Sequence, residues 1–417
     1  MTRLVAEALE RNPRLAASRA QSEAAQAAIS RAGTWEDPVL SLGFVNLRTT
    51  SFDFADDFMT MKMVQLAQQI PLPGQIGHRR AAAALRAASA EHMVEVARVE
   101  VAAEVKGAYA ELYYRDRALE IVDRNLRILR GLEDVTRTRY ATGVGRQPAV
   151  LRAGLEIDGL EAQRVQLVAS RHATLARLNA LRDRPASTQI DETPFPHFLS
   201  ALPERGGQAL AFVSALEAGR NRGLPARAGI PPLDSLIALA LESKPTLRAH
   251  VARIAAQEEM VELARALRWP APQLSIGYGQ REGFPDMVNA SVSFRLPIFL
   301  GAKQEAAVRE ESAVLARERA THDRMVAEIE RDVTAAYSLV LDALGQLDRY
   351  DFGILQRSEA TLNATLAAYR SGAEDFLALL DSQTRLYRFE LERHRRLADL
   401  LRAWADLERS VGREIEP

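Results

Sequence analysis

One stretch decides the fold, and it occurs twice: as Pro38-Val39-Leu40-Ser41-Leu42-Gly43-Phe44 and as Pro272-Gln273-Leu274-Ser275-Ile276-Gly277-Tyr278. In both copies large apolar residues alternate with small or polar ones. This alternation is the pattern of a β-strand whose two faces meet different surroundings. Because the pattern recurs in the second half of the chain, it indicates an internal duplication.

Further landmarks recur in the same order around this stretch. The junction Ile70-Pro71-Leu72-Pro73-Gly74 recurs as Leu296-Pro297-Ile298-Phe299-Leu300-Gly301. The turn Tyr140-Ala141-Thr142-Gly143 recurs as Tyr369-Arg370-Ser371-Gly372. The other matched pairs are Leu4 with Leu236, Leu9 with Leu241, Pro13 with Pro245, Leu15 with Leu247, and Tyr109 with Tyr337. Each half of the chain therefore follows one structural plan.

The duplication predicts three regions. We expect a first structural repeat at residues 1–183 and a second at residues 234–417. Between them, residues 184–233 are rich in proline and glycine, a composition that interrupts long helices and is typical of a linker.

Most of each repeat has a helical pattern. Residues 3–32 and 234–267 are rich in Ala, Leu, Glu and Arg, which predicts one amphipathic helix in each half. After each junction, a helical pattern of about 65 residues without proline predicts a helix roughly 100 Å long. Returning helices are expected at residues 149–183 and 376–412. Apolar residues seven apart predict supercoiled packing in both halves; they are Val105, Leu112, Leu119 and Leu126, matched by Val333, Val340, Leu347 and Ile354.

Each half also contains two short strands with period-two alternation. In the second strand we expect Met59, Met61 and Met63 on the apolar face and Lys62 on the polar face. Alternation of this kind is typical of transmembrane β-barrel strands, although a half-buried soluble sheet alternates in the same way. The long helices cannot fold back over the strands, and about eight strands are needed to close a barrel. We therefore expect several chains to form one barrel, with a lumen lined by Lys62, Asn289, Ser291, Ser293 and Arg295.

Composition and charge exclude several classes of protein. Lys and Arg (54 residues) balance Asp and Glu (55 residues), so no basic surface for nucleic acid is expected. The chain has no cysteine, and its seven histidines lack the spacing of a metal site. No catalytic motif is present, and we predict a protein that is not an enzyme and that uses no cofactor or metal. Its apolar runs are shorter than the roughly 18 to 20 residues of a membrane-spanning helix.

The order of the landmarks resembles the TolC family of outer-membrane efflux channels. The junction at residues 70–74 and the segment Arg139-Tyr140-Ala141-Thr142-Gly143, with Val150-Leu151-Arg152-Ala153 after it, are most similar to the cation-efflux (heavy-metal) branch. The resemblance implies a mostly α-helical chain with a small β part. It also implies a homotrimer, in which three sets of four strands form one transmembrane β-barrel and long helices continue it as a periplasmic tunnel.

The same resemblance implies a function and partners. The chain would be the outer-membrane channel of a tripartite efflux system, surrounded by lipid and giving metal cations or drugs a passive exit path. An inner-membrane RND-type pump would drive export through a periplasmic adaptor. Family members carry a signal peptide, whereas this chain begins Met1-Thr2-Arg3-Leu4-Val5 without one. Two interpretations stay open: the sequence is a mature or truncated form, or it is not exported.

A gate is implied near the second turn, because the family closes the periplasmic mouth of its tunnel there. Counted from Tyr369, one gating aspartate of the family falls on Asp381, whereas the other falls on Ala378 and the arginine position is Glu374. Since Asp375 also restores negative charge nearby, the predicted gate consists of Asp381, Glu374 and Asp375. A single aspartate at the start of a helix can instead serve only the helix dipole.

The two turns are the predicted docking site for the adaptor. Glycine ends a helix in the left-handed conformation without a Cβ penalty, and the equivalence of the two halves predicts that the turns lie side by side. The predicted docking residues are Tyr140, Gly143, Tyr369 and Gly372. The alternative is that the glycines are only helix caps.

A soluble periplasmic or cytoplasmic coiled-coil scaffold is the alternative hypothesis for the whole chain. It explains the rows of apolar residues seven apart, but it does not explain the alternating strands. The two hypotheses differ in extraction, because a channel requires detergent and a scaffold does not.

Overall fold

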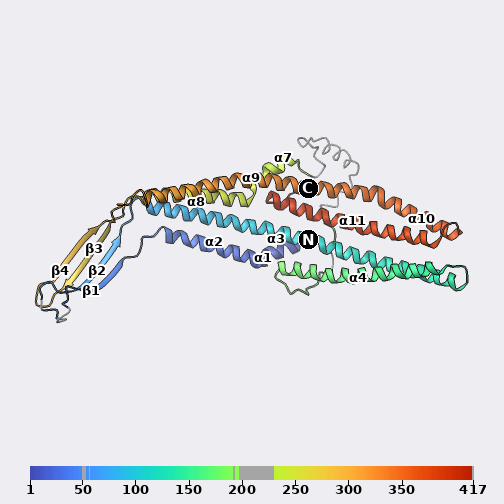
Figure 1. Cartoon of the computed structure of the whole chain (residues 1–417), viewed down its shortest axis with the longest axis horizontal. Helices are drawn as coiled ribbons and strands as arrows, with labels where there is room; N and C mark the ends of the chain where they lie inside the picture. The colour runs from blue at the N-terminus through green and yellow to red at the C-terminus, as the bar shows by residue number, and fades with distance from the viewer. Residues whose placement is uncertain (49–52, 56, 191–192, 197–229, 416–417) are drawn as a thin grey trace. The chain divides into compact units, whose positions relative to one another are not determined.

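In the computed structural model (Figure 1), the chain forms two compact units. The structure describes all residues except 49–52, 56, 191–192, 197–229 and 416–417. The hairpin unit comprises Met1–Ala17, Glu95–Pro245 and Val326–Pro417, and the sheet unit comprises Ser18–Val94 and Thr246–Met325. Most of the predicted linker at residues 184–233 lies outside the described residues.

The sheet unit contains four antiparallel strands in the order β1-β2-β3-β4 (Figure 1). They are β1 (Val39–Val45), β2 (Met61–Gln69), β3 (Gln273–Gln280) and β4 (Met287–Ser293). Strands β1 and β4 are the edges, and neither has a second strand partner within the described part of the chain. An edge strand presents unpaired backbone N–H and C=O groups, so both edges of this sheet can accept a further strand.

One face of the sheet is apolar and exposed. Residues that pair directly across an antiparallel ladder point to the same side, and Leu42, Val64 and Tyr278 form one such row. The large apolar side chains of this face are 41% to 72% exposed; they are Leu40, Leu42, Phe44, Val64, Leu66, Leu274, Ile276, Tyr278, Val288 and Val292. The opposite face carries glycine, serine and amide side chains, including Ser275 and Ser291, whose hydroxyl oxygens lie 2.7 Å apart, together with fewer apolar residues, which are Val39, Val45, Met61, Met63, Ala67 and Met287.

The predicted facing of β2 is wrong. Lys62 pairs with Phe44 and with Gln280, so it lies on the apolar face, and Asn289, Ser291 and Ser293 lie on the other. Strand β2 begins at Met61 rather than at Met59, and its exposed apolar residues Val64 and Leu66 have even numbers. The prediction placed the methionines on the apolar face, and a shift of one residue along the strand exchanges the two faces.

Met61 instead packs over a glycine on the polar face. A Cβ atom at Gly279 would lie 2.5 Å from the Met61 sulfur, so any other residue there would displace this side chain, which is 5% exposed. The Lys62 ammonium lies 4.6 Å from the centre of the Phe54 ring on the apolar side. Arg295, predicted to line a lumen as part of the fourth strand, follows the end of β4 at Ser293.

The first helical segment of each half is broken, contrary to the prediction of one helix at 3–32 and one at 234–267. The observed helices are α1 (Thr2–Arg11), α2 (Pro13–Ala32), α7 (Leu233–Ser243) and α8 (Pro245–Ala266). Proline lacks an N–H group and forces the preceding residue out of the helical conformation. Accordingly, Asn12 has ψ 125° and Lys244 has ψ 119°.

The long helix of the first half is continuous, as predicted. It is α3 (Gln75–Ala141), 67 residues long, and it begins after Gly74, whose φ of +91° permits the turn from the strand. The returning helix is α4 (Gln147–Leu181). Among the residues that the structure describes, no helix combines the length and the apolar character needed to cross a membrane.

The long helix of the second half contains a π-helical turn. It runs as α9 (Gln304–Arg349), the π-helix η1 (Tyr350–Ile354) and α10 (Leu355–Ser371), and α11 (Phe376–Val411) returns. Compared with Tyr109 to Tyr140, the matching span from Tyr337 to Tyr369 contains one additional residue. A π-helical turn accommodates one additional residue without breaking the helix, and here the Leu355 N–H bonds the Tyr350 carbonyl.

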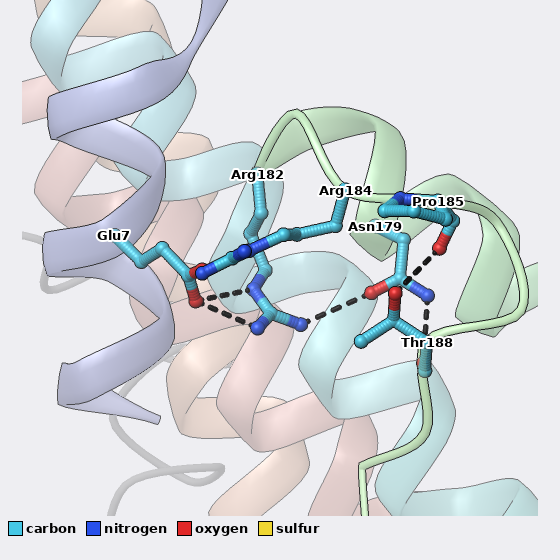
Figure 2. A network of polar contacts seen from close by, with 6 residues as sticks. All are labelled: Glu7, Asn179, Arg182, Arg184, Pro185 and Thr188. Atoms are coloured by element: carbon cyan, nitrogen blue, oxygen red, sulfur yellow. Dashed lines mark hydrogen bonds and ion pairs between the residues drawn. The ribbon is translucent and has the colours of Figure 1, made fainter.

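In the hairpin unit, a polar network ties α1 to the end of α4 (Figure 2). Arg182 donates to the Glu7 carboxylate from Nε and Nη2, at 2.9 and 2.6 Å, and to Asn179 Oδ1 at 3.0 Å. The Asn179 amide in turn donates to the Thr188 carbonyl at 2.8 Å. Hydrogen bonds from Arg182, and secondarily from Arg184, lower the pKa of the Glu7 carboxyl. The pairing of Glu7 with the two arginines therefore stabilises the folded chain fully above the unfolded-chain pKa of roughly 4.3, and this contribution is lost as the pH falls through the lowered pKa of Glu7.

Candidate functional site

The candidate site lies in the hairpin unit, where α3 turns into α4 and α10 turns into α11 (Figure 1). The two turns have the same backbone. Gly143 has φ +79° and Gly372 has φ +80°, the left-handed conformation that ends a helix without strain only at glycine. The Val144 N–H bonds the Arg139 carbonyl at 3.0 Å, and the Ala373 N–H bonds the Ala368 carbonyl at 2.9 Å.

The two hairpins end side by side. They share one hydrophobic core, and the guanidinium carbon of Arg139, on α3, lies 4.6 Å from the centre of the Tyr369 ring, on α10. A guanidinium at this distance from a ring is a favourable cation–π contact. The core residues nearest the turns come from α4, α10 and α11; they are Ala149, Ala153, Tyr369, Phe376, Leu379 and Leu380.

The tyrosines of the two turns have different surroundings. Tyr369 is 9% exposed and meets the edge of the Phe376 ring, with the ring centres 6.1 Å apart. Tyr140 is 47% exposed, and the residue matching Phe376 is the exposed Gln147. Of the predicted docking residues, Tyr140, Gly143 and Gly372 therefore lie at the surface, whereas Tyr369 supports its turn from the core.

The predicted gate carboxylates all belong to the second turn and the start of α11. Asp375 is the N-cap of α11, and its side chain accepts a hydrogen bond from the Ala378 N–H at 2.9 Å. Glu374 is exposed. Asp381 lies one and a half turns into the helix, is 60% exposed, and forms an ion pair of 3.0 Å with Arg385. The three acidic groups therefore lie at or just after one turn, and Arg385 is the counterion of Asp381.

Comparison with known proteins identifies the family. The sequence profile of the outer membrane efflux protein family matches residues 4–182 and 236–413. This chain belongs to the outer membrane efflux protein family. The two matched ranges each contain two strands of the sheet, one long helix, one Tyr-x-x-Gly turn and one returning helix.

Solved channels have the same fold as this efflux family protein. The outer-membrane channel OprN is 20% identical and has a TM-score of 0.78, with 99% of this chain and 89% of OprN covered. CusC is 15% identical, with a TM-score of 0.79 and coverage of 99% and 92%. VceC from Vibrio cholerae is 16% identical, with a TM-score of 0.77 and coverage of 100% and 96%. No curated protein sequence matches the chain.

Two features of the site were missed by sequence reasoning although the sequence contained a signal. Arg385 stands four residues after Asp381, the spacing at which opposite charges meet on a helix. Asn125 of α3 and Gln383 of α11 form a buried hydrogen bond of 2.8 Å inside the shared core, and both stand among apolar residues of helical period. Within the described ranges, no three His, Asp or Glu side chains are placed to hold a metal ion.

Proposed function

We propose that this efflux family protein is the outer-membrane channel of a tripartite efflux system. It gives substrates a passive exit path, and an inner-membrane RND-type pump supplies the energy through a periplasmic adaptor. The observation that carries the proposal is the exposed apolar face of a four-stranded sheet whose two edges are unpaired within the described chain. Water is a poor solvent for such a face, whereas lipid is a good one.

The proposal requires an oligomer, and we assign it three chains. Four strands are too few to close a barrel, for which about eight is the minimum, while three sets of four strands suffice. The apolar face would meet lipid, and the face with Asn289, Ser291 and Ser293 would line the lumen. Lys62 belongs to the lipid side of this arrangement, near the Phe54 ring, and not to the lumen.

A second apolar stripe on α4 supports the oligomer independently. One side of α4 is buried in the shared core, with Ile157, Leu160 and Leu167. On another side, Leu151, Leu155 and Val165 are 66%, 66% and 69% exposed. A helix with two apolar sides needs a neighbour on each, and the residues that the structure describes cover only one. The neighbouring chain of the trimer would cover the other.

The site at the hairpin turns has two roles in this proposal. The adaptor docks on the exposed surface of Tyr140, Gly143 and Gly372, with Tyr369 beneath it. Asp381, with Glu374 and Asp375, forms an acidic constriction when threefold symmetry brings three copies around one axis. Clustered carboxylates attract cations to a narrow mouth, which suits metal cations and cationic drugs. The segments at residues 70–74 and 139–143 favour the cation-efflux branch.

The domain plan of the proposal follows the duplication. Residues 1–183 and 234–417 form two equivalent repeats, each of which contributes two strands and one hairpin, and residues 184–233 join them. The family match at 4–182 and 236–413 supports these boundaries.

Membrane extraction and conductance test the proposed function. The chain, expressed with an export signal, should fractionate with outer membranes, require detergent for extraction and cross-link as a trimer. In planar bilayers the purified trimer should conduct ions. A chain that is extracted by salt or high pH alone and that gives no conductance would be a coiled-coil scaffold, and the channel proposal would be wrong.

A further inference from the structure

A pocket of about 490 Å³ lies in the hairpin unit, away from the turns. It is formed by α3, α11 and the segment 193–196. Its polar and aromatic lining consists of three arginines, one carboxylate, one imidazole and two aromatic rings: Arg117, Arg124, Arg127, Glu120, His394, Tyr113 and Phe195. Its volume is in the range of sites that hold small organic molecules, which is about 300 to 1,000 Å³.

The aromatic wall of the pocket is fixed by hydrogen bonds. The Tyr109 hydroxyl donates to the Pro194 carbonyl at 2.5 Å, and the Thr193 hydroxyl donates to the Asp116 carboxylate at 2.7 Å. These two contacts hold the segment against α3. As a result the Phe195 ring lies 5.5 Å from the Tyr113 ring, measured between centres.

The other wall is cationic. Arg117 pairs with Glu120 at 2.7 Å, and Arg124 pairs with Glu390. Arg127 has no ion-pair partner among the residues that the structure describes, although it lines the same pocket. The pocket therefore has more guanidinium than carboxylate charge.

His394 also lines the pocket. Its Nδ1 lies 3.0 Å from the Tyr113 hydroxyl oxygen. Burial, and secondarily the positive charges of Arg393, Arg117 and Arg124, lower the pKa of His394 to about 4. The imidazole is thus neutral at pH 7, so the positive charge of the pocket comes from its arginines.

We propose that this pocket binds a small aromatic carboxylate, with the carboxylate on Arg124 and Arg127 and the ring packed against the aromatic pair of Tyr113 and Phe195. A guanidinium and a carboxylate form strong paired hydrogen bonds, and an aromatic ring gains from contact with two others. A metal cation is repelled by the same wall. The inference concerns a separate pocket and does not depend on the proposed channel function.

The test uses the purified full-length chain in a neutral detergent, with 4-fluorobenzoate as the probe and ¹⁹F NMR as the readout. We expect saturable binding of 4-fluorobenzoate and at least tenfold weaker binding of 4-fluorobenzamide, its uncharged analogue. Inorganic phosphate should not displace the probe at equal concentration. Equal affinity for benzoate and benzamide, or displacement by phosphate alone, would overturn the proposal.

Two variants and a matched control locate the binding. Arg127→Gln and Phe195→Leu should each weaken 4-fluorobenzoate binding at least fivefold. Arg130→Gln is the control, because Arg130 lies on the same helix, is paired with Glu161 at 2.7 Å and is not part of the pocket; its affinity should equal that of the unmodified chain. Arg127 is exposed, so its replacement should leave folding intact. If Arg127→Gln and Arg130→Gln bind equally well, the probe binds elsewhere and the assignment is wrong.

Discussion

The turn between α3 and α4 and the turn between α10 and α11 have one backbone and two different surroundings. Both end their first helix at a left-handed glycine, Gly143 or Gly372. In the first turn Tyr140 is half exposed, whereas in the second Tyr369 is buried against Phe376. The difference teaches that the duplication retained the residues that the backbone requires, while the side chains beside them took separate roles.

The charges of the two turns differ in the same way. Arg146 occupies the position of Asp375, and Arg152 that of Asp381. Asp375 caps α11 with its side chain, whereas the N-cap of α4 has no side-chain hydrogen bond. The second turn is thus acidic and self-capped, and the first is basic and relies on Pro148 near the start of its helix.

The tyrosines should give the largest difference between the turns. Tyr369→Ala removes a buried ring and should cost about 3 to 5 kcal/mol of unfolding free energy, the usual loss for a large aromatic core residue. Tyr140→Ala should cost less than about 1 kcal/mol but should impair export in cells that lack another channel. Denaturant unfolding of the two variants measures the first effect. Equal losses of stability would mean that the turns do not differ in packing.

The glycines should behave alike in stability. A Cβ at Gly143 or Gly372 would meet no atom within 4 Å, so alanine introduces only the strain of a positive φ, about 1 to 2 kcal/mol. Thermal unfolding of Gly143→Ala and Gly372→Ala checks this value.

Tryptophan at either position separates capping from docking. Gly143→Trp and Gly372→Trp should be about as stable as the alanine variants and should still form trimers, but they should abolish export by covering the proposed docking surface. Normal export by both tryptophan variants would limit the glycines to a capping role.

The two N-cap positions should respond unequally to alanine. Asp375→Ala loses the hydrogen bond to the Ala378 N–H and should cost about 1 kcal/mol. Arg146→Ala loses no cap hydrogen bond and should be close to neutral. Chemical denaturation of both variants measures the contrast, and a larger loss for Arg146→Ala would contradict the assignment of the caps.

Asp381 should have the smallest effect on stability and a distinct effect on conductance. Its ion pair with Arg385 is exposed, and such pairs contribute little, about 0 to 1 kcal/mol. In planar bilayers, Asp381→Asn should lose cation selectivity or sensitivity to block by multivalent cations. Arg152→Gln, at the matching position of the first turn, is the control and should not lose selectivity. Unchanged single-channel currents in Asp381→Asn would place the gate elsewhere.

Much of the fold could be predicted from the repeat. The continuous α3, both turns and the returning helices follow from proline-free helical stretches that end at Tyr-x-x-Gly. The breaks at Pro13 and Pro245 could also have been predicted, because the two prolines stand at matched positions of the repeat. They were missed because the residues around them favour helix. The π-helical turn could have been predicted from the one additional residue between Tyr337 and Tyr369.

The facing of strand β2 and the pocket could not be predicted from short-range sequence patterns. Whether Met61 or Lys62 shares a face with Phe44 depends on the register with β1, which is set by cross-strand pairing and not by β2 alone. The contact of Phe195 with Tyr113 joins residues far apart in the sequence, next to the hydrogen bonds of Tyr109 with Pro194 and of Thr193 with Asp116. For the proposed gate, Asp381 follows the second turn in α11, and its ion pair with Arg385 was not predicted.

The facing of the sheet is the central claim, and one pair of variants tests it most directly. Val292 and Ser291 are neighbours in β4 on opposite faces. An arginine in place of Val292 would stand in hydrocarbon at a cost of about 2 to 4 kcal/mol near mid-depth, whereas an arginine in place of Ser291 would face water. The measurement is the amount of trimer in outer membranes. We predict that Val292→Arg loses trimer and that Ser291→Arg retains it; equal assembly of the two variants, or loss only in Ser291→Arg, would contradict the account.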